Sequence, residues 1–242
     1  MSTSETTNQN HHHHLLHTQA ADFWMARSAI FVIAMLQLLL VNDFALWSRW
    51  LGPAVELLLL VPLSVATAWA QHKARRATTD EHFRLVARGR RMIRRTALGL
   101  TILVTLLNFV ALYFLLKALL TGHAGPAQTL LIDAMNIWCT NIIAFALWFW
   151  SIDRGGPASR GLTSKQHVDF LFPQMSMADP AYRSWVPGFI DYLFVAFTNA
   201  TAFSPTDTMP LSARAKLLSM AEAAVSLLTL ALVAARAVNI LA

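Results

Sequence analysis

The sequence predicts an all-α integral membrane protein, a bundle of about six transmembrane helices, and three observations support this class. Of its 242 residues, 56% are hydrophobic and 13% are charged, a composition far from that of soluble domains. Several stretches are apolar over about 20 residues, the helical length that crosses a hydrocarbon core. A strongly basic segment separates two of these stretches, as cytoplasmic loops of membrane proteins often do.

Residues 1–26 form a polar tail that contains the histidine run His11 to His14. We expect a disordered cytoplasmic tail, because these residues bury too little apolar surface to fold. A flexible tail gives a metal ion no fixed geometry, so we predict no metal site there. The apolar segment that follows has the length of a span and no clean cleavage site, so we expect the first helix to be retained.

Residues 27–152 form the predicted four-helix membrane region, with spans at 28–47, 52–70, 96–120 and 128–152. Between the second and third spans lies the basic segment 71–95, which has nine Lys or Arg against two acids. Because positive loops stay inside, we place this segment in the cytoplasm. Its second half can form a helix that runs directly into the third span.

The end of the basic segment predicts a lipid contact. Each base near an anionic membrane surface contributes roughly 1 kcal/mol. No nucleic-acid recognition fold surrounds these bases, so we predict anionic lipids at the cytoplasmic face as partners and no nucleic acid. The residues concerned are Arg88, Arg90, Arg91, Arg94 and Arg95.

Residues 153–186 form a predicted cytoplasmic loop, and residues 187–242 form a C-terminal helical hairpin with spans at 187–203 and 211–241. This arrangement puts both termini in the cytoplasm and the start of the last helix outside. The span at 187–203 is short, so five spans plus a re-entrant helix is the alternative. Asp191 falls in the first turn of this helix, where an acid complements the helix dipole as a cap.

The last helix carries a polar face at successive spacings of three, four, three and seven residues. It consists of Ser219, Glu222, Ser226, Thr229 and Arg236. Such spacing places the side chains on one side of a helix, and we expect that side to face inward. Glu222 is the costliest member, since a lone carboxylate within a span must be protonated or find a partner.

Asp133 is the second carboxylate within a span, and it shares a face of the fourth span with Asn136 and Thr140. An ionisable group at this depth indicates a functional site, so Asp133 joins Glu222, Ser226, Thr229 and Ser219 as candidates for an ion path. The alternative is that these polar groups only form hydrogen bonds that hold helices together.

The turn between the last two spans, TNATAFSPTDTMP, has the outline of a potassium-channel pore loop. Its candidate residues are Thr198, Thr201, Ser204 and Asp207. A potassium filter uses backbone carbonyls in conformations that glycine permits, and this turn has no glycine. We therefore predict no potassium-type filter. The sequon-like Asn199-Ala200-Thr201 is interpreted as a chance match.

Several short motifs carry a resemblance to a known family. They are Asp169 to Pro173 (DFLFP), Asp191 to Phe194 (DYLF), Ala196 to Thr198, Ser204 to Asp207, and Arg214. With its layout of spans, the chain resembles a family of uncharacterised bacterial multi-pass inner-membrane proteins of unknown function, whose C-terminal hairpin resembles in outline the pore hairpin of potassium channels. The resemblance implies the fold and the bacterial inner membrane, and it supplies no activity.

The sequence contains no zinc-protease motif, serine nucleophile elbow or phosphate-binding glycine loop, so we predict neither an enzyme nor a cofactor. The single cysteine, Cys139, lies in an apolar run and is interpreted as a packing residue.

We therefore expect a channel-like or transport protein that passes a cation or proton, with a homo-oligomer as a candidate assembly. The alternative is a membrane interaction or assembly protein that does not transport, whose basic loop binds lipid or a partner.

Overall fold

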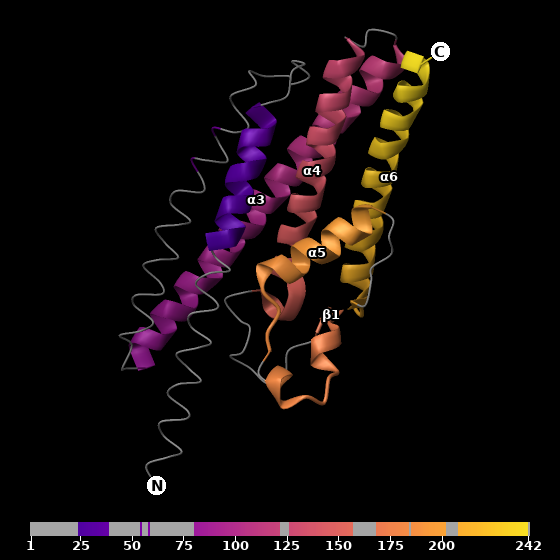
Figure 1. Ribbon diagram of the computed structural model, residues 1–242. Helices are drawn as coiled ribbons and strands as arrows, with labels where there is room; N and C mark the ends of the chain where they lie inside the picture. The colour runs from indigo at the N-terminus through magenta and orange to yellow at the C-terminus, as the bar shows by residue number, and fades with distance from the viewer. Residues whose placement is uncertain are drawn as a thin grey trace.

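The computed structural model describes residues 24–38, 54, 58, 80–121, 126–156, 168–183, 185–201 and 208–241, and gives only the backbone of 80–93, 127 and 236–241. This part of the chain is mostly helical (Figure 1). The predicted tail 1–26, apart from its last three residues, lies outside the described residues, as do nearly all of the predicted span 52–70 and residues 39–47 of the span before it.

Among the described residues, three helices are long and apolar enough to cross a membrane. They are α3 (Asp80–Leu120), α4 (Ala127–Ile152) and α6 (Ala213–Leu241), with apolar stretches at Arg94–Leu120, Gln128–Gly155 and Ala213–Ala235. These stretches confirm the helices predicted at 96–120, 128–152 and 211–241. A further apolar helix, Trp24–Leu38, covers the first part of the predicted span 28–47.

The helix α3 extends well beyond its apolar stretch. Its 41 residues rise about 60 Å, twice the thickness of a hydrocarbon core. The prediction that the basic segment forms a helix continuous with the third span is therefore confirmed from Asp80 onward. Since Arg94 begins the apolar stretch, the turns before it project past the rest of the bundle (Figure 1).

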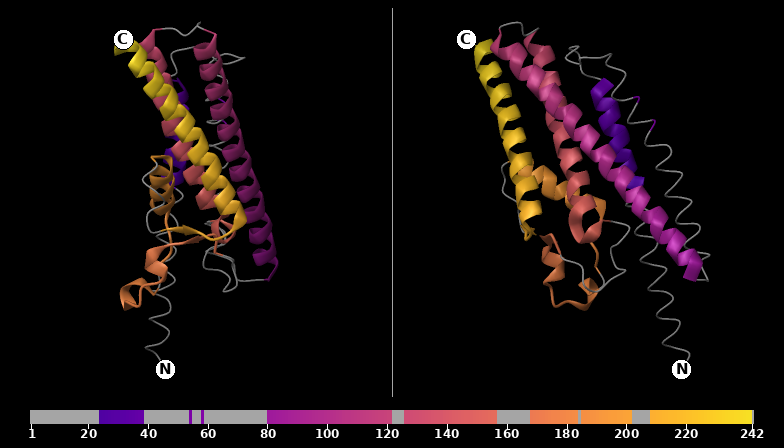
Figure 2. Two further views of the ribbon diagram at one scale, coloured as in Figure 1. Left: turned by 90° about the vertical axis from the view of Figure 1, so that its right-hand side faces the viewer. Right: turned by 180° about the vertical axis from the view of Figure 1, so that it is seen from behind.

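The helix α4 is the centre of the described bundle. It packs against α3, α5 (Phe189–Ala200) and α6. Of the most apolar 18 residues of each long helix, 67% are buried in α4, against 33% in α3 and 17% in α6. The two views of Figure 2 show α4 between the other long helices. The main core cluster contains Phe145, Phe149 and Trp150 of this helix, together with Tyr192 of α5.

The helix α5 is shorter than the complete span predicted at 187–203, so the structure does not confirm a sixth spanning helix. It has 12 residues and therefore rises about 18 Å, little more than half of a hydrocarbon core. It lies beside the lower halves of α4 and α6 in Figure 1. A helix of this length is short enough for the predicted alternative, in which the segment re-enters.

A two-stranded antiparallel sheet brings the chain back to the end from which α5 starts. Strand β1 (Phe170–Leu171) pairs with β2 (Met209–Pro210), with Phe170 opposite Pro210. The described parts of the segment between α4 and α5 also contain three short 3₁₀ helices, η1 (Asp153–Gly155), η2 (Pro173–Met175) and η3 (Pro180–Tyr182). As a result, α4 ends and α6 begins at the same end of the bundle.

This pairing contradicts the predicted topology of the hairpin. The start of the last helix was expected on the side opposite to the loop 153–186, and the sheet holds the two together. The helix α6 then runs to the end where α3 joins α4, opposite the basic start of α3 (Figure 1). The end of α6 and the start of α3 thus lie at opposite ends of the described bundle, whereas the prediction put both on the cytoplasmic side.

Candidate functional site

The polar face of α6 is buried, as its spacing predicted. Glu222, Ser226 and Thr229 are each 0% exposed, and Ser219 is half-buried. The apolar side chains of the same helix point the other way, since Leu217 and Met220 are exposed. Because α6 turns its polar groups inward and its apolar groups outward, it has the pattern of a helix that faces lipid on one side and a polar interior on the other.

Asn199, in the last turn of α5, forms the main contact with Glu222. Its amide nitrogen Nδ2 donates to Glu222 Oε2 at 2.8 Å and to the backbone carbonyl of Ser219 at 2.8 Å. From the sequence, Asn199 was interpreted only as part of a chance sequon, and no function was predicted for it. Its contact with Glu222 depends on the length of α5, because a helix that ends halfway along the bundle places Asn199 at the depth of Glu222.

Asn141 of α4 completes the group. Its Nδ2 donates to Ser226 Oγ at 2.9 Å and lies 3.3 Å from the backbone carbonyl of Glu222. Three helices therefore meet at Asn141, Asn199, Glu222 and Ser226, which we call the polar junction. Asn141 was missed as a candidate, although it follows Thr140 in the polar set of the fourth span.

One oxygen of Glu222 differs from the other. Oε1 is buried and has no hydrogen-bond partner among the described residues, whereas Oε2 accepts from Asn199. A buried polar atom without a partner costs free energy, and such atoms often mark a place of function. The last turn of α5, which carries Asn199, also presents the negative end of the helix dipole to this region.

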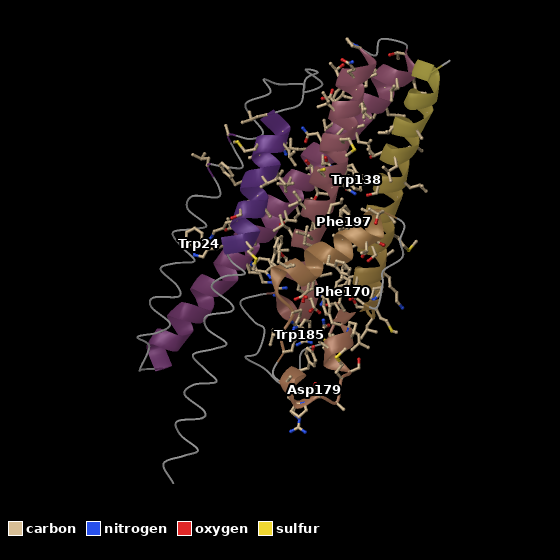
Figure 3. The ribbon with its side chains drawn as sticks, viewed as in Figure 1. Trp24, Trp138, Phe170, Asp179, Trp185 and Phe197 are labelled. Carbon is tan, nitrogen blue, oxygen red and sulfur yellow. The ribbon has the colours of Figure 1, made fainter. Side chains whose placement is uncertain are left out.

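An aromatic pair joins the two helices that carry the asparagines of the polar junction. Trp138, one turn before Asn141 on α4, and Phe197, two residues before Asn199 on α5, lie with ring centroids 6.3 Å apart in an edge-to-face arrangement (Figure 3).

Asp133 is fully buried, but the structure does not bring it to the polar junction. It lies eight residues before Asn141 on α4, about 12 Å along the helix. Its neighbour Asn136 faces elsewhere, because its Nδ2 donates to the carbonyl of Leu36 in the helix Trp24–Leu38. The two carboxylates predicted to share one ion path therefore occupy different parts of the bundle.

The hydroxyl groups of the turn predicted after α5 are used within the helix itself. Thr198 Oγ1 donates to the carbonyls of Phe194 and Val195 at 2.9 and 3.0 Å. Thr201 Oγ1 donates to the carbonyl of Phe197 at 2.9 Å. Ser204 and Asp207 lie outside the described residues.

A second polar group, which we call the clasp, lies at the end of the bundle where α4 ends and α6 begins. It consists of Asp153, Asp169, Tyr192, Ser212 and Arg214, and it includes positions from three of the short motifs noted in the sequence. Asp153 Oδ2 accepts from the Tyr192 hydroxyl at 2.5 Å, and its Oδ1 accepts from the backbone of Asp169 at 2.8 Å. The role of Asp153 was not foreseen from the sequence.

Asp169 is the centre of the clasp. Arg214 donates to both of its carboxylate oxygens, at 2.7 and 2.5 Å, and Ser212 donates to Oδ1 at 2.5 Å. Burial alone would raise the pKa of Asp169, but the hydrogen bonds from Arg214 and Ser212 and the charge of Arg214 hold it below its ordinary value. The carboxylate is therefore charged, and it fixes the start of α6.

Asp191 has the structural role that was predicted. Its Oδ2 accepts from the backbone N–H of Gly188 at 2.7 Å, which caps the start of α5.

The predicted lipid-contact arginines are only partly described. Arg95 is exposed, and Arg94 is half-buried near Gly156 at the end of α4. The side chains of Arg88, Arg90 and Arg91 lie outside the described residues.

Within the described part of the chain, no group of three or more His, Cys, Asp or Glu residues could hold a metal ion. Comparisons of the whole chain with protein-family models, with curated proteins and with solved structures found no match.

Proposed function

We propose that this protein is a transport-type membrane protein that passes a monovalent cation or a proton through the polar junction. The observation that carries the proposal is the fully buried Glu222, with one unpartnered oxygen, at the inner end of a helix that stops halfway across the bundle. Ionisable groups at membrane depth are costly, and they commonly mark ion paths and proton relays.

The position of α5 supports this proposal. Transporters and channels often place half-length helices so that their ends face a binding site near the middle of the bilayer. Here the C-terminal end of α5 meets Glu222, and the negative end of a helix dipole favours a positive charge. A carboxylate and a helix C-terminus together suit a cation or a proton and disfavour an anion.

The polar face of α6 offers the continuation of the path. Ser226 and Thr229 follow Glu222 by one and two turns and are fully buried, toward the end of the bundle opposite the clasp. Thr229 Oγ1 donates to the carbonyl of Val225 at 2.8 Å, which leaves its oxygen as an acceptor. The path we propose therefore uses side chains of α6, since the turn after α5 lacks the glycines of a potassium filter.

We further propose five crossing helices and one re-entrant helix in a bacterial inner membrane, in keeping with the family that the motifs resemble. The basic start of α3 lies in the cytoplasm, in contact with anionic lipids. The clasp is then cytoplasmic and the end of α6 lies outside. This orientation moves Arg214 and Lys216 to the basic side, so it agrees with the positive-inside rule. The protein could assemble as a homo-oligomer.

The test is a flux measurement on purified protein in liposomes. We expect the wild type to pass protons or monovalent cations, and Glu222→Gln to reduce this flux to the level of empty liposomes. The control is the same substitution at Glu81, near the basic start of α3, which should leave the flux unchanged. If the wild type shows no flux above empty liposomes under any imposed gradient, the proposal is wrong.

A second candidate function is that of an assembly protein that does not transport. It is favoured by one observation, namely that the hydrogen bonds of the polar junction each join α4 or α5 to α6, as in polar contacts that hold helices together. On this account Glu222→Gln lowers the stability or changes the oligomer size, no flux is seen, and a partner protein co-purifies in constant ratio.

A further inference from the structure

Resting on the proposed function, we infer that the ion handled at the polar junction is a proton and not a metal cation, and that Asn199 and Asn141 determine this choice. The inference depends on which atoms these two side chains present to Glu222.

The orientation of both amide groups is fixed by backbone carbonyls. The amide of Asn199 lies 2.8 Å from the carbonyl of Ser219, and that of Asn141 lies 3.3 Å from the carbonyl of Glu222. A carbonyl oxygen only accepts hydrogen bonds, so the amide atom facing it must be the NH₂ group. Asparagine oxygen and nitrogen are otherwise hard to distinguish, and these contacts remove the ambiguity.

The polar junction is therefore lined by donors around a single carboxyl group. Asn199 uses the same NH₂ to hold Glu222 Oε2, and Asn141 uses its own to hold Ser226 Oγ. A bound metal cation needs several oxygen atoms that point their lone pairs at it. The Asn199 N–H presents hydrogen to Glu222 Oε2 and the Asn141 N–H presents hydrogen to Ser226 Oγ, so a metal ion that used these oxygen atoms as ligands would have to displace both asparagines.

A proton makes no such demand. One carboxyl oxygen, Oε2, stays bonded to Asn199, and the other, Oε1, is free to take and release the proton. An O–H bond forms at Oε1 as a hydronium ion on one side gives up its proton and becomes water, and that bond breaks as the proton passes to a water molecule on the other side. In the ionised form the Asn199 N–H donates to a carboxylate, and such charge-assisted hydrogen bonds are the stronger kind.

The experiment uses the full-length protein in liposomes with trapped pyranine, in N-methylglucamine buffer free of alkali metals, with thiocyanate to balance charge. We expect an imposed pH gradient to decay faster than in empty liposomes, and Glu222→Gln to abolish the difference. Sodium or potassium at equal concentration on both sides should leave the rate unchanged. Uptake of radioactive sodium or rubidium should equal that of empty liposomes.

The possible failures are distinct. Glu222-dependent uptake of sodium or rubidium overturns the inference and leaves the proposed function standing. Absence of any flux overturns the proposed function, and the inference with it. If Glu222→Gln does not fold, Glu222→Asp keeps the carboxyl group but draws it away from Asn199, and we expect slower proton flux with no uptake of metal ions.

The role of the asparagines is tested by Asn199→Asp, which replaces the donor with oxygen atoms beside Glu222. We expect its proton flux to become slower when sodium is added, because two adjacent carboxyl groups can bind the metal ion. The matched control is Asn136→Asp, on the same bundle but bonded to Leu36 and not to Glu222. Equal sodium sensitivity in the two variants, or none in either, shows that the asparagine donors do not select the ion.

Discussion

At the scale of single residues, the end of α4 shows how closely the chain is packed near the clasp. Arg154 and Gly156 both have positive φ, 50° and 89°, so the chain turns sharply as soon as the helix ends. A Cβ atom added at Gly156 would lie 2.8 Å from the backbone carbonyl of Ser151. This position combines a left-handed backbone with a close approach, and glycine satisfies both requirements.

Gly156→Ala should therefore destabilise the protein by about 1–3 kcal/mol, because the backbone is strained and the carbonyl of Ser151 must move. The control is Gly99→Ala in α3, where nothing lies within 4 Å of the added atom. There we expect a gain of roughly 0.5–1 kcal/mol from helix propensity. Unfolding in detergent by heat or denaturant measures both, and equal effects of the two substitutions would contradict the structure at Gly156.

Sequence predicted correctly which side chains face the interior when this depends only on their spacing along a single helix. The inward face of Glu222, Ser226 and Thr229 follows from spacing along α6, and burial confirmed it. Asn141 and Asn199 could not be found in this way, because their importance depends on how three helices meet. The burial of Asp133 agrees with an inward position, but its distance from the polar junction could not be predicted, since sequence does not tell how two helices place their acids.

At the scale of elements, the clasp fixes where α6 begins. Arg214 is half exposed on its side chain while Asp169 is almost fully buried, so one buried carboxylate holds a cation at the surface. The same carboxylate accepts from Ser212 just before the helix, and the backbone carbonyl of Asp169 accepts from Leu211 at 2.8 Å. Without this charge, the start of α6 would lose its side-chain hydrogen bonds to Asp169, the residue before β1.

The stability contributed by Asp169 should depend on pH in a defined direction. Its pKa is lower in the folded protein than the ordinary value of 3.8, so the charged form is favoured by folding. The contribution is complete above the ordinary value and disappears as the pH falls through the lower folded value. We expect the difference in unfolding free energy between wild type and Asp169→Asn to be constant near neutrality and to shrink below pH 3.8. A difference that grows on acidification would contradict the clasp.

The helices of the described bundle were predicted to different degrees. Hydropathy found α3, α4 and α6, because each is apolar for longer than a membrane is thick. For α5 hydropathy predicted a complete span, because a short apolar helix followed by a turn can have the same mean hydropathy as a moderately apolar spanning helix. The stop at Ala200 depends on packing against α4 and α6, which hydropathy does not measure.

At the scale of the whole molecule, the arrangement of the ends depends on contacts between distant parts of the sequence. The pairing of β1 with β2 and the bonds between Asp169 and Arg214 join segments about 40 residues apart. A topology built on span counting alone alternates sides at each apolar stretch. It therefore placed the start of α6 opposite the loop 153–186, to which the structure joins it, and had no means of detecting the clasp.

The side of each loop can be tested by labelling single cysteines in sealed vesicles, in a background where Cys139 is replaced by Ala. Met177 and Ala213 are both exposed and lie at the clasp end, whereas Thr121 is exposed at the other end of α3. We expect Met177→Cys and Ala213→Cys to react with an impermeant maleimide from one side and Thr121→Cys from the other. If Ala213→Cys instead reacts from the same side as Thr121→Cys, the segment 187–203 crosses the membrane completely and the re-entrant arrangement is wrong.

The sheet pairing also has a mechanical consequence. Because β1 and β2 are bonded to each other, the chain between them, which includes α5, forms a closed loop fixed at its base. Tyr192 is bonded to Asp153 at that base, whereas Asn199 lies at the far end of the helix. The start of α5 is therefore held at the clasp, and its other end carries Asn199. A small rotation of the helix about the clasp would displace Asn199 more than Tyr192, and would change the length of its hydrogen bond to Glu222.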